Sequence, residues 1–356
     1  MRRIVIGFVN QGNEISGMSM VSFKTNFERI FKELDSNLNS IRVLIISDLI
    51  DSNFCLFVKK FPVEVSIFGP RDWEALALPP MKNGSFATYW KFDLFSHLNS
   101  QEILIYFDSD TFVLNNLNIP KLLERIQLES RPSIGGGRST SPANGTQTSY
   151  LMMVPSHRPV FERIGYRIDP NPYSYFNAGF FISVNIGSID SAELLRIFEF
   201  YYLLNKQELI WHDQDLLNVY FEFQICPLPL SYNISTGMLN RKYFAINQMN
   251  YLTYKAFLHP KIVHASGGVL NTTRYYPYRN RIIELAKDLL SNPLHQLSPS
   301  EKAEINAFLS QITLTQLRTA WNLTLTILRI YRQKLIVDTE RISFLPNLLL
   351  RLIRKL

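Results

Sequence analysis

The sequence predicts an α/β domain whose central sheet is mostly parallel and covered by helices on both faces. Short apolar runs alternate with longer stretches in which apolar residues recur at helical spacing, as expected when helical crossovers join parallel strands. With 356 residues, 46% of them hydrophobic, the chain can bury a large core. In such a sheet, ligands bind beyond the carboxyl ends of the strands, so polar residues there are the first candidates for a site.

The first part of the chain alternates strands and helices. Four buried apolar runs predict strands at residues 3–9, 42–47, 63–68 and 102–107. Helical spacing of apolar residues predicts helices at residues 20–38 and 86–98.

The second part continues with a predicted glycine-rich loop at residues 130–149. After it we expect a strand at 175–184, helices at 190–205 and 213–221, and a short strand at 261–264. Ser298 and Glu301 have the spacing of a capping box, which predicts a helix start. The sequence therefore predicts an α/β domain over residues 1–295 and a helical extension over residues 296–356.

Composition limits the partners and the cellular location. The net charge of +7 fits phosphate-bearing substrates or an anionic membrane, and neither a zinc-finger spacing nor an RNA-binding motif indicates nucleic acid. Cys55 and Cys226 are expected to be buried free thiols. The N-terminal apolar run is too short for a signal peptide, and no run of about 20 apolar residues predicts a membrane span. We therefore expect a cytoplasmic protein.

Two aspartates follow the strand at residues 102–107. If the strand continues through them, Asp108 and Asp110 emerge on the same side, because alternate residues share a face. Two adjacent carboxylates favour a divalent cation, which can bridge the phosphates of a nucleotide. Ser109 is small and leaves room for that nucleotide. The alternative is a solvated turn without function.

Three later segments place polar groups at the ends of predicted elements. FNAGFFISV puts Asn177 and Ala178 at the start of a strand, where a ligand can hydrogen-bond an amide and approach the backbone. HDQDLLN puts Asp213 and Gln214 at a helix start, where helix capping is the simpler explanation. His264 ends a strand and suits manganese or a similar ion as a third ligand beside two aspartates.

Taken in order, ATYWKF, YFDSDTFV, YFNAGFF, HDQDLLN and a terminal His-x-x-Gly resemble glycosyltransferase family 8 over about residues 3–270. The resemblance implies a GT-A fold, Mn²⁺ or Mg²⁺ as cofactor, and a UDP-sugar donor whose anomeric configuration is retained. It also implies that Asp108, Asp110 and His264 hold the metal ion.

The same resemblance implies which residues contact the donor. Asn177, Ala178, Asp213 and Gln214 would hold the transferred sugar, with Gln214 nearest the reacting face of the anomeric carbon. Gln214 and Asp213 are therefore the expected catalytic residues.

The chain departs from the family pattern at three places. Lys91 stands where the family usually has an arginine that contacts the donor, and a lysine lacks the planar fork of that side chain. Gly267, expected near the diphosphate, is not followed by the usual Lys-Pro-Trp, and Arg274 or Arg279 are the candidates to replace that lysine. Asn10 replaces an acidic nucleobase motif and is expected to contact a uracil edge.

The expected reaction is transfer of a hexose, glucose or galactose, to a glycan or lipid-linked acceptor. A front-face route and a covalent route through Asp213 both remain open. So does the role of residues 345–356 (LPNLLLRLIRKL), which either pack on the domain or lie on the inner face of an anionic membrane. The rival functions are a non-catalytic nucleotide-sugar or glycan-binding protein and a metal-dependent phosphohydrolase or nucleotidyltransferase, which would need more carboxylates.

Overall fold

The structure, a computed structural model, describes residues 3–12, 16–34, 41–76, 86–99, 101–127, 133–138, 176–184, 192, 195–196, 212–221, 225–235, 259–265 and 278–313. The elements follow the chain as β1 (Arg3–Asn10), α1 (Ser16–Glu33), β2 (Ile41–Ser47), α2 (Asn53–Val58), β3 (Glu64–Phe68), η2 (Glu74–Leu76), η3 (Ala87–Trp90), α3 (Lys91–Ser96), β4 (Glu102–Phe107), β5 (Thr111–Val113), α4 (Ile119–Gln127), β6 (Ser133–Arg138), β7 (Phe176–Val184), α7 (His212–Tyr220), β8 (Ile225–Leu228), η5 (Leu230–Tyr232), β9 (Ile234–Ser235), β10 (Ile262–His264), α9 (Arg279–Ser291), η9 (Pro293–His295) and α10 (Pro299–Thr313).

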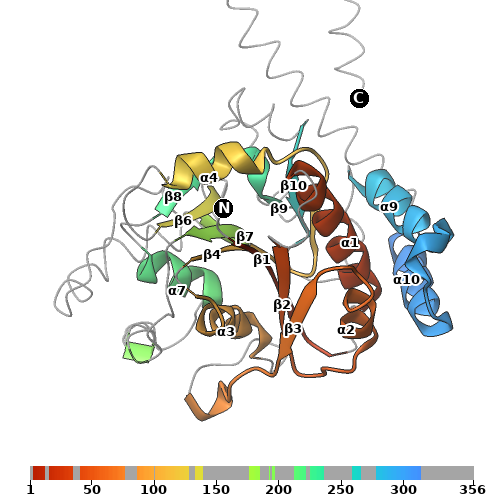
Figure 1. Cartoon of the computed structure of the whole chain (residues 1–356), viewed down its shortest axis with the longest axis horizontal. Helices are drawn as coiled ribbons and strands as arrows, with labels where there is room; N and C mark the ends of the chain where they lie inside the picture. The colour runs from red at the N-terminus through yellow and green to blue at the C-terminus, as the bar shows by residue number, and fades with distance from the viewer. Residues whose placement is uncertain are drawn as a thin grey trace, which may run out of the picture.

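Seven strands form a central sheet in the order β3-β2-β1-β4-β7-β6-β8 (Figure 1). β1 pairs in parallel with β2 and β4, and β2 pairs in parallel with β3. β7 runs antiparallel to its neighbours β4 and β6, whereas β6 and β8 pair in parallel. The predicted α/β class with a mostly parallel sheet is confirmed.

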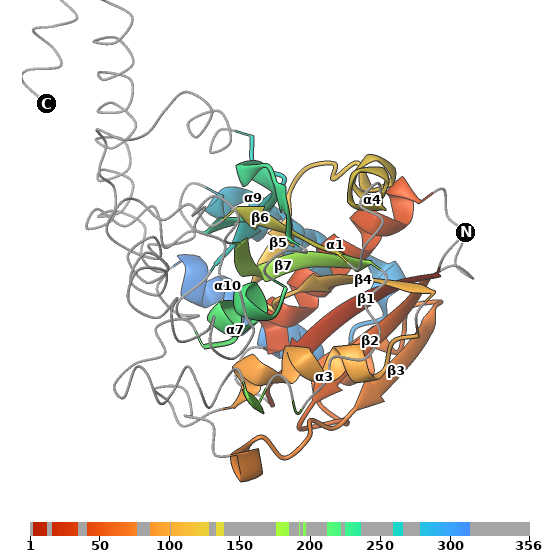
Figure 2. The same cartoon turned by 90° about the vertical axis from the view of Figure 1, so that its left-hand side faces the viewer.

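Side chains of the central strands alternate between two apolar layers, as the two-residue period of a strand requires. Ile6 and Phe8 of β1 belong to the layer that α1 and α2 cover, together with Ile105 of β4. Val5 and Leu104 face the opposite layer, which α3 and α7 cover. Figure 1 shows these helices on opposite sides of the sheet, and Figure 2 shows α3 along one face of β1, β2 and β4.

A second, three-stranded sheet lies beyond the carboxyl end of β4. Its order is β5-β10-β9, with β10 antiparallel to β5 and parallel to β9. Because β5 begins shortly after β4 ends, this small sheet brings a distant part of the chain to the carboxyl edge of the central sheet.

Some elements differ from their predictions. The predicted loop at residues 130–149 was wrong for residues 133–138, which form β6 and pair on both sides with β7 and β8. Backbone pairing with two neighbours outweighs the low strand propensity of its three glycines. The predicted helix at 86–98 is a 3₁₀ turn, η3, followed by the short helix α3. α1 begins earlier than predicted, at Ser16.

α10 lies beyond the predicted boundary near residue 295 and packs on α1. The capping box is confirmed: the backbone N–H of Glu301 donates to Ser298 Oγ at 3.2 Å, and that of Ser298 donates to Glu301 Oε2 at 2.6 Å. α1 and α10 approach closely at Gly17, where an added Cβ would lie 2.3 Å from the carbonyl oxygen of Glu304. The division into two domains at residue 295 stays a prediction.

Three further predictions concern burial and membranes. Cys55 and Cys226 are buried free thiols, as predicted. Among the described residues, every helix is too short or too polar to cross a bilayer. Most of the predicted helix at 190–205 and all of residues 345–356 lie outside the described residues.

Candidate active site

The two aspartates lie in a tight turn directly after β4. β4 ends at Phe107, and the backbone N–H of Thr111 donates to the carbonyl oxygen of Asp108, with 3.0 Å between N and O. Both carboxylates emerge together at the carboxyl end of β4, as predicted, but a turn and not a continuing strand brings them together. The backbone N–H of Asp108 donates to the carbonyl oxygen of Gly179 at 2.9 Å and anchors the turn to β7.

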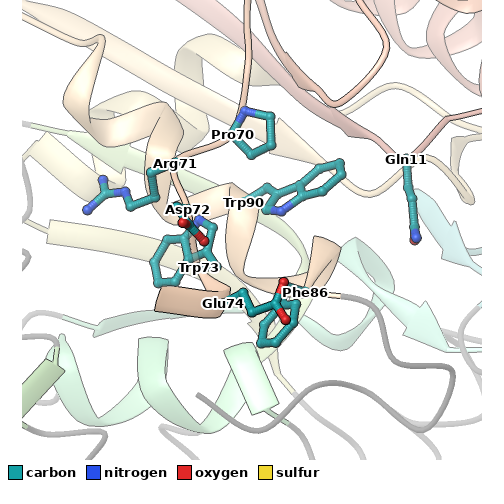
Figure 3. Close-up of a pocket in the computed structure, with 8 residues that line it drawn as sticks. All are labelled: Gln11, Pro70, Arg71, Asp72, Trp73, Glu74, Phe86 and Trp90. Carbon is teal, nitrogen blue, oxygen red and sulfur yellow. The ribbon is translucent and has the colours of Figure 1, made fainter. Parts of the chain in front are cut away.

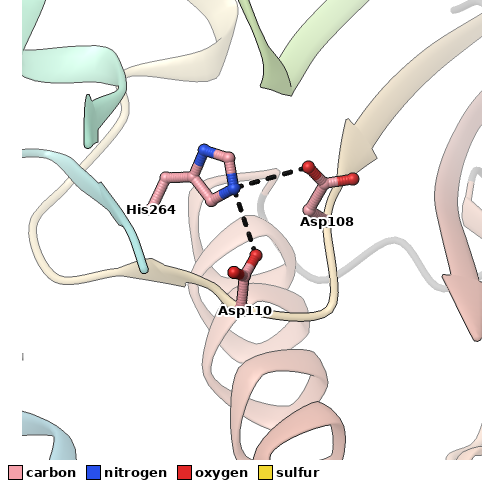
Figure 4. A group of neighbouring side chains, drawn as sticks. All are labelled: Asp108, Asp110 and His264. Atoms are coloured by element: carbon pink, nitrogen blue, oxygen red, sulfur yellow. Dashed lines mark ion pairs between the residues drawn. The ribbon is translucent and has the colours of Figure 1, made fainter. Parts of the chain in front are cut away.

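β10 brings His264 to this turn. β10 pairs antiparallel with β5, and in that register His264 lies opposite Thr111. Nε2 of His264 lies 3.4 Å from Oδ2 of Asp108 and 3.2 Å from Oδ1 of Asp110 (Figure 4). One ligand atom of each residue lies within 4.8 Å of the others. The three predicted metal ligands thus form one group.

The donor set of this group fits a divalent cation. Carboxylate oxygens suit Mg²⁺ and Mn²⁺, and an imidazole nitrogen favours Mn²⁺ and similar ions. Burial alone would raise the pKa of Asp110, but the neighbouring His264 lowers it below its ordinary value. Burial alone would lower the pKa of His264, but Asp110 and then Asp108 raise it. A proton on His264 therefore does in part what a bound cation would do, which is to neutralise the two carboxylates.

Lys91 lies on the other side of Asp108. It is the first residue of α3 and is 3% exposed. Its Nζ lies 3.3 Å from Oδ1 of Asp108 and forms a second ion pair with Asp213. Burial alone would lower the pKa of Lys91, but Asp108 and Asp213 raise it above its ordinary value, so the ammonium group stays charged. Lys91 thus links the aspartate turn to the start of α7.

Asp213 and Gln214 lie in the first turn of α7 and are buried. The hydroxyl of Thr88 donates to Oδ1 of Asp213, while Lys91 pairs with its Oδ2. The side-chain oxygen of Gln214 accepts a hydrogen bond from the backbone N–H of Ala178 at 3.1 Å. The start of α7 is therefore attached both to Lys91 and to the start of β7.

Asn177 lies next to His264. Its Oδ1 is 2.9 Å from Nδ1 of His264, 2.9 Å from the backbone N of Gly179 and 2.8 Å from Nδ2 of Asn233. This oxygen therefore contacts groups of the protein itself, and a contact of Asn177 with sugar stays a prediction.

Sequence reasoning missed Tyr106, Thr88 and Asn233. The hydroxyl of Tyr106 donates to Oδ1 of Asp108, and burial, followed by the charge of Asp108, raises the pKa of Tyr106 well above its ordinary value. Tyr106 had a usable signal, because it stands two residues before Asp108 in YFDSDTFV, near the end of β4. Thr88 had a weaker one, three residues before Lys91 in ATYWKF. No pattern in the sequence points to Asn233.

A pocket of about 260 Å³ lies between the end of β1 and η3 (Figure 3). It is lined by Gln11, Pro70, Arg71, Asp72, Trp73, Glu74, Phe86 and Trp90. Trp90, which lines the pocket, directly precedes Lys91, whose Nζ contacts Asp108. Asn10 is 3% exposed, and its Nδ2 donates to the hydroxyls of Ser47 at 3.3 Å and Ser52 at 3.4 Å. Gln11, rather than Asn10, therefore faces the pocket.

The structure describes only some of the other predicted site residues. Ser109 is half-buried in the turn between the two aspartates. Gly267, Arg274 and the side chain of Arg279 lie outside the described residues, so contacts of these three with a diphosphate stay predictions.

Comparisons with solved structures find glycosyltransferases with a similar fold. The galactosyltransferase LgtC, solved in complex with donor and acceptor sugar analogs, covers 84% of this chain and 99% of its own, with a TM-score of 0.57 and 15% identity. The bifunctional glycosyltransferase WbbM covers 86% of this chain and 52% of its own, with a TM-score of 0.52 and 18% identity. At these identities the likeness concerns the fold, which is of the GT-A type. A search of curated proteins gives no match.

The family model described as Glycosyl transferase family 8 matches residues 18–269. That range is more than half of the chain, and it includes the aspartate turn, the starts of β7 and α7, and His264. The chain therefore belongs to glycosyltransferase family 8.

Proposed function

We propose that the protein transfers a hexose, glucose or galactose, from a UDP-sugar to a hydroxyl group of a glycan or lipid-linked acceptor. The transfer retains the anomeric configuration of the donor sugar and uses Mn²⁺ or Mg²⁺ as cofactor. The observation that carries this proposal is the meeting of Asp108, Asp110 and His264 at the carboxyl end of β4. The structurally similar LgtC was solved with donor and acceptor sugar analogs, which supports the same kinds of partner here.

The balance of charges supports a cation-bound diphosphate. The carboxylates of Asp108 and Asp213 pair with the ammonium group of Lys91, and that of Asp110 lies in the same group as Asp108 and His264. With His264 neutral, three negative charges face one positive charge, so a divalent cation would balance the excess. Asp108, Asp110 and His264 would hold such a cation, which would stabilise the negative charge of the departing diphosphate.

The pocket beside Lys91 suits the nucleoside of the donor. Phe86 is half-buried and offers a flat apolar surface on which a base can stack, and Trp90, which is only 7% exposed, lines the pocket with it. The amide of Gln11 can both donate to and accept from a base edge. We therefore assign the base contact to Gln11 instead of Asn10, whose amide N–H groups point toward Ser47 and Ser52.

The contacts of Asp213 favour the front-face route. Thr88 donates to one carboxylate oxygen and Lys91 pairs with the other, so both oxygens are engaged and the group is a poor nucleophile. In the front-face route the bond between the anomeric carbon and the diphosphate oxygen breaks. The acceptor oxygen bonds to the same face of that carbon, and its proton passes to the departing diphosphate. Gln214, held by Ala178, would line the reacting face of the sugar.

A binding assay followed by a donor screen tests the proposal. UDP should raise the unfolding temperature more with Mn²⁺ than without it, because a cation held by the carboxylates would attract the negatively charged diphosphate. One UDP-hexose should then give a glycosylated acceptor by mass spectrometry, and NMR should find the donor's anomeric configuration in the product. Binding without turnover of any donor would favour the non-catalytic alternative. Phosphate release without glycosyl transfer would favour the phosphohydrolase.

For location we propose a cytoplasmic protein that contacts the inner face of the plasma membrane through residues 345–356. The proposal rests on the sequence, in which leucines share one helical face and basic residues the other. Deleting residues 347–356 should abolish salt-sensitive sedimentation with anionic liposomes. Unchanged sedimentation would exclude this segment as the contact.

A further inference from the structure

His264 has two ring nitrogens, and they face different partners. Nε2 lies toward Asp108 and Asp110 (Figure 4), whereas Nδ1 lies 2.9 Å from Oδ1 of Asn177. A neutral imidazole carries its proton on one nitrogen and can bind a metal ion only through the other. The nitrogen that carries the proton therefore decides whether Nε2 can be a ligand.

The backbone N–H of Gly179 fixes the orientation of the Asn177 amide. This N–H lies 2.9 Å from the side chain of Asn177, and because a backbone N–H only donates, the atom facing it is the amide oxygen. Nδ2 of Asn233 donates to the same oxygen at 2.8 Å and to the backbone carbonyl of Asn177 at 3.0 Å. Nδ1 of His264 therefore meets an oxygen, which only accepts, and must itself carry the proton.

Gly179 also fixes the position of the imidazole ring. A Cβ at Gly179 would lie 2.2 Å from Nδ1 and 2.3 Å from Cε1 of His264, so the ring lies directly against the glycine. The carbonyl oxygen of Gly179 accepts from the backbone N–H of Asp108 at 2.9 Å and from the hydroxyl of Thr111 at 3.1 Å. One residue of β7 thus touches both the aspartate turn and the histidine.

We infer that Asn177, Asn233 and Gly179 are positioning residues that keep a proton on Nδ1 of His264, so that Nε2 is the nitrogen that binds a cation held with Asp108 and Asp110. The inference rests on the proposed function, in that it takes this group as a cation site. It gives Asn177 a task within the protein, separate from the sugar contact that the family resemblance implies. Hydrogen-bond partners of ligating histidines typically contribute about 10- to 100-fold to metal affinity.

Substitutions at Asn177 and one matched control test the inference. Asn177→Ala removes the acceptor, whereas Asn177→Asp keeps an acceptor oxygen at the same place. Asn218→Ala is the control, because Asn218 hydrogen-bonds the backbone N and O of Phe176 at 2.8 and 2.9 Å in the same strand without touching His264. The readouts are the Kd for Mn²⁺ by electron paramagnetic resonance and the ¹⁵N spectrum of histidine-labelled protein saturated with diamagnetic Mg²⁺. His264→Gln identifies the signals of His264, and thermal unfolding measures stability separately.

Asn177→Ala should weaken Mn²⁺ binding by about tenfold or more and shift His264 toward the tautomer with its proton on Nε2. Asn177→Asp and Asn218→Ala should retain the wild-type Kd and tautomer, whatever they do to stability. An unchanged Kd in Asn177→Ala would overturn the inference, as would a loss in Asn177→Asp as large as in Asn177→Ala. If Asn177→Ala does not fold, the wild type decides, because a Mg²⁺-saturated ring with its proton on Nε2 would also overturn the inference. A wild type that binds no Mn²⁺ would instead refute the metal site of the proposed function.

Discussion

The central sheet carries buried ion pairs at both ends of its parallel strands, and the two ends are built differently. At the amino end, Nε and Nη2 of Arg42 in β2 contact the two carboxylate oxygens of Glu102 in β4 at 2.7 and 2.8 Å. Arg42 also donates to the carbonyl oxygen of His97, and Glu102 accepts from the backbone N–H of Asn99. Each charge at this end therefore has one opposite charge and further hydrogen bonds.

At the carboxyl end the charges do not match one to one. Lys91 is shared between Asp108 and Asp213, and Asp110 faces His264. The difference indicates that the amino-end pair stabilises the fold, whereas the carboxyl end keeps a surplus of negative charge for a ligand to balance. Substitutions at the two ends should therefore change different properties.

Asp110→Asn should give the largest effect. It removes a ligand of the proposed cation, which contributes several kcal/mol at the departing diphosphate, so transfer should fall by about 1,000-fold or more. Because the side chain of Asp110 is 18% exposed and lies in a turn, stability should change by only about 1 kcal/mol. Initial rates with a UDP-sugar and thermal unfolding measure the two quantities. Full metal-dependent turnover in this variant would refute the site.

Glu102→Gln should have the opposite profile. It leaves the buried guanidinium of Arg42 without its counter-charge, which should lower the free energy of unfolding by about 3–5 kcal/mol. Glu64→Gln is the matched control, because Glu64 pairs with Arg3 at the surface, with side chains 54% and 36% exposed, and should cost about 0–1 kcal/mol. Urea unfolding measures both. Equal losses in the two variants would show that burial of the Arg42–Glu102 pair does not increase its contribution to stability.

The stability that the Arg42–Glu102 pair contributes should fall at acidic pH. Burial alone would raise the pKa of Glu102, but Arg42 outweighs it, and the pKa lies below the ordinary value of 4.5. A depressed pKa contributes stability that is present above that value and is lost as the pH falls through the folded-state pKa. The difference in stability between the wild type and Glu102→Gln should therefore shrink as the pH falls below 4.5.

The contrast between the two ends also explains what the sequence could predict. β1, β2 and β4 were predictable because strands buried on both faces appear as continuous apolar runs. Asp108, Asp110 and His264 were predictable because family motifs carry them in a recognisable order. The positioning of His264 was not predictable, because β10 reaches the turn only by pairing with β5, and Asn233 reaches Asn177 only through that packing.

Lys91→Met should change the metal affinity at the carboxyl end. The ammonium group lies 3.3 Å from Oδ1 of Asp108 and repels a cation bound there, so its removal should raise the affinity for Mn²⁺ by about tenfold. Transfer should nevertheless fall, because Asp213 loses its partner. Lys24→Met is the matched control, since Lys24 is also buried and paired, but with Glu28 and Asp288 instead of carboxylates of the site. Titration calorimetry should find no change in that control, and a weakened affinity in Lys91→Met would contradict the charge balance.

Tyr232→Phe should give the smallest effect, at the sheet that carries His264. The hydroxyl of Tyr232 donates to the carbonyl oxygen of Leu117 at 2.7 Å and accepts from Nζ of Lys261 at 2.6 Å, which ties β10 to the segment after β5. Its loss should cost about 1 kcal/mol at neutral pH. Burial, followed by the charge of Glu33, raises the pKa of Tyr232 from 10.0 to about 12.

A raised pKa contributes stability that is present below the unfolded-state value of 10.0 and is lost as the pH rises through about 12. The wild type should therefore lose its advantage over Tyr232→Phe between these two pH values, in urea unfolding at each pH. A constant difference across that range would show that the hydroxyl ionises equally in both states. Tyr232 contacts Lys261 directly before β10 and not the imidazole of His264, so the Kd for Mn²⁺ should stay at its wild-type value. That outcome would separate support of the small sheet from the direct positioning of His264 by Asn177.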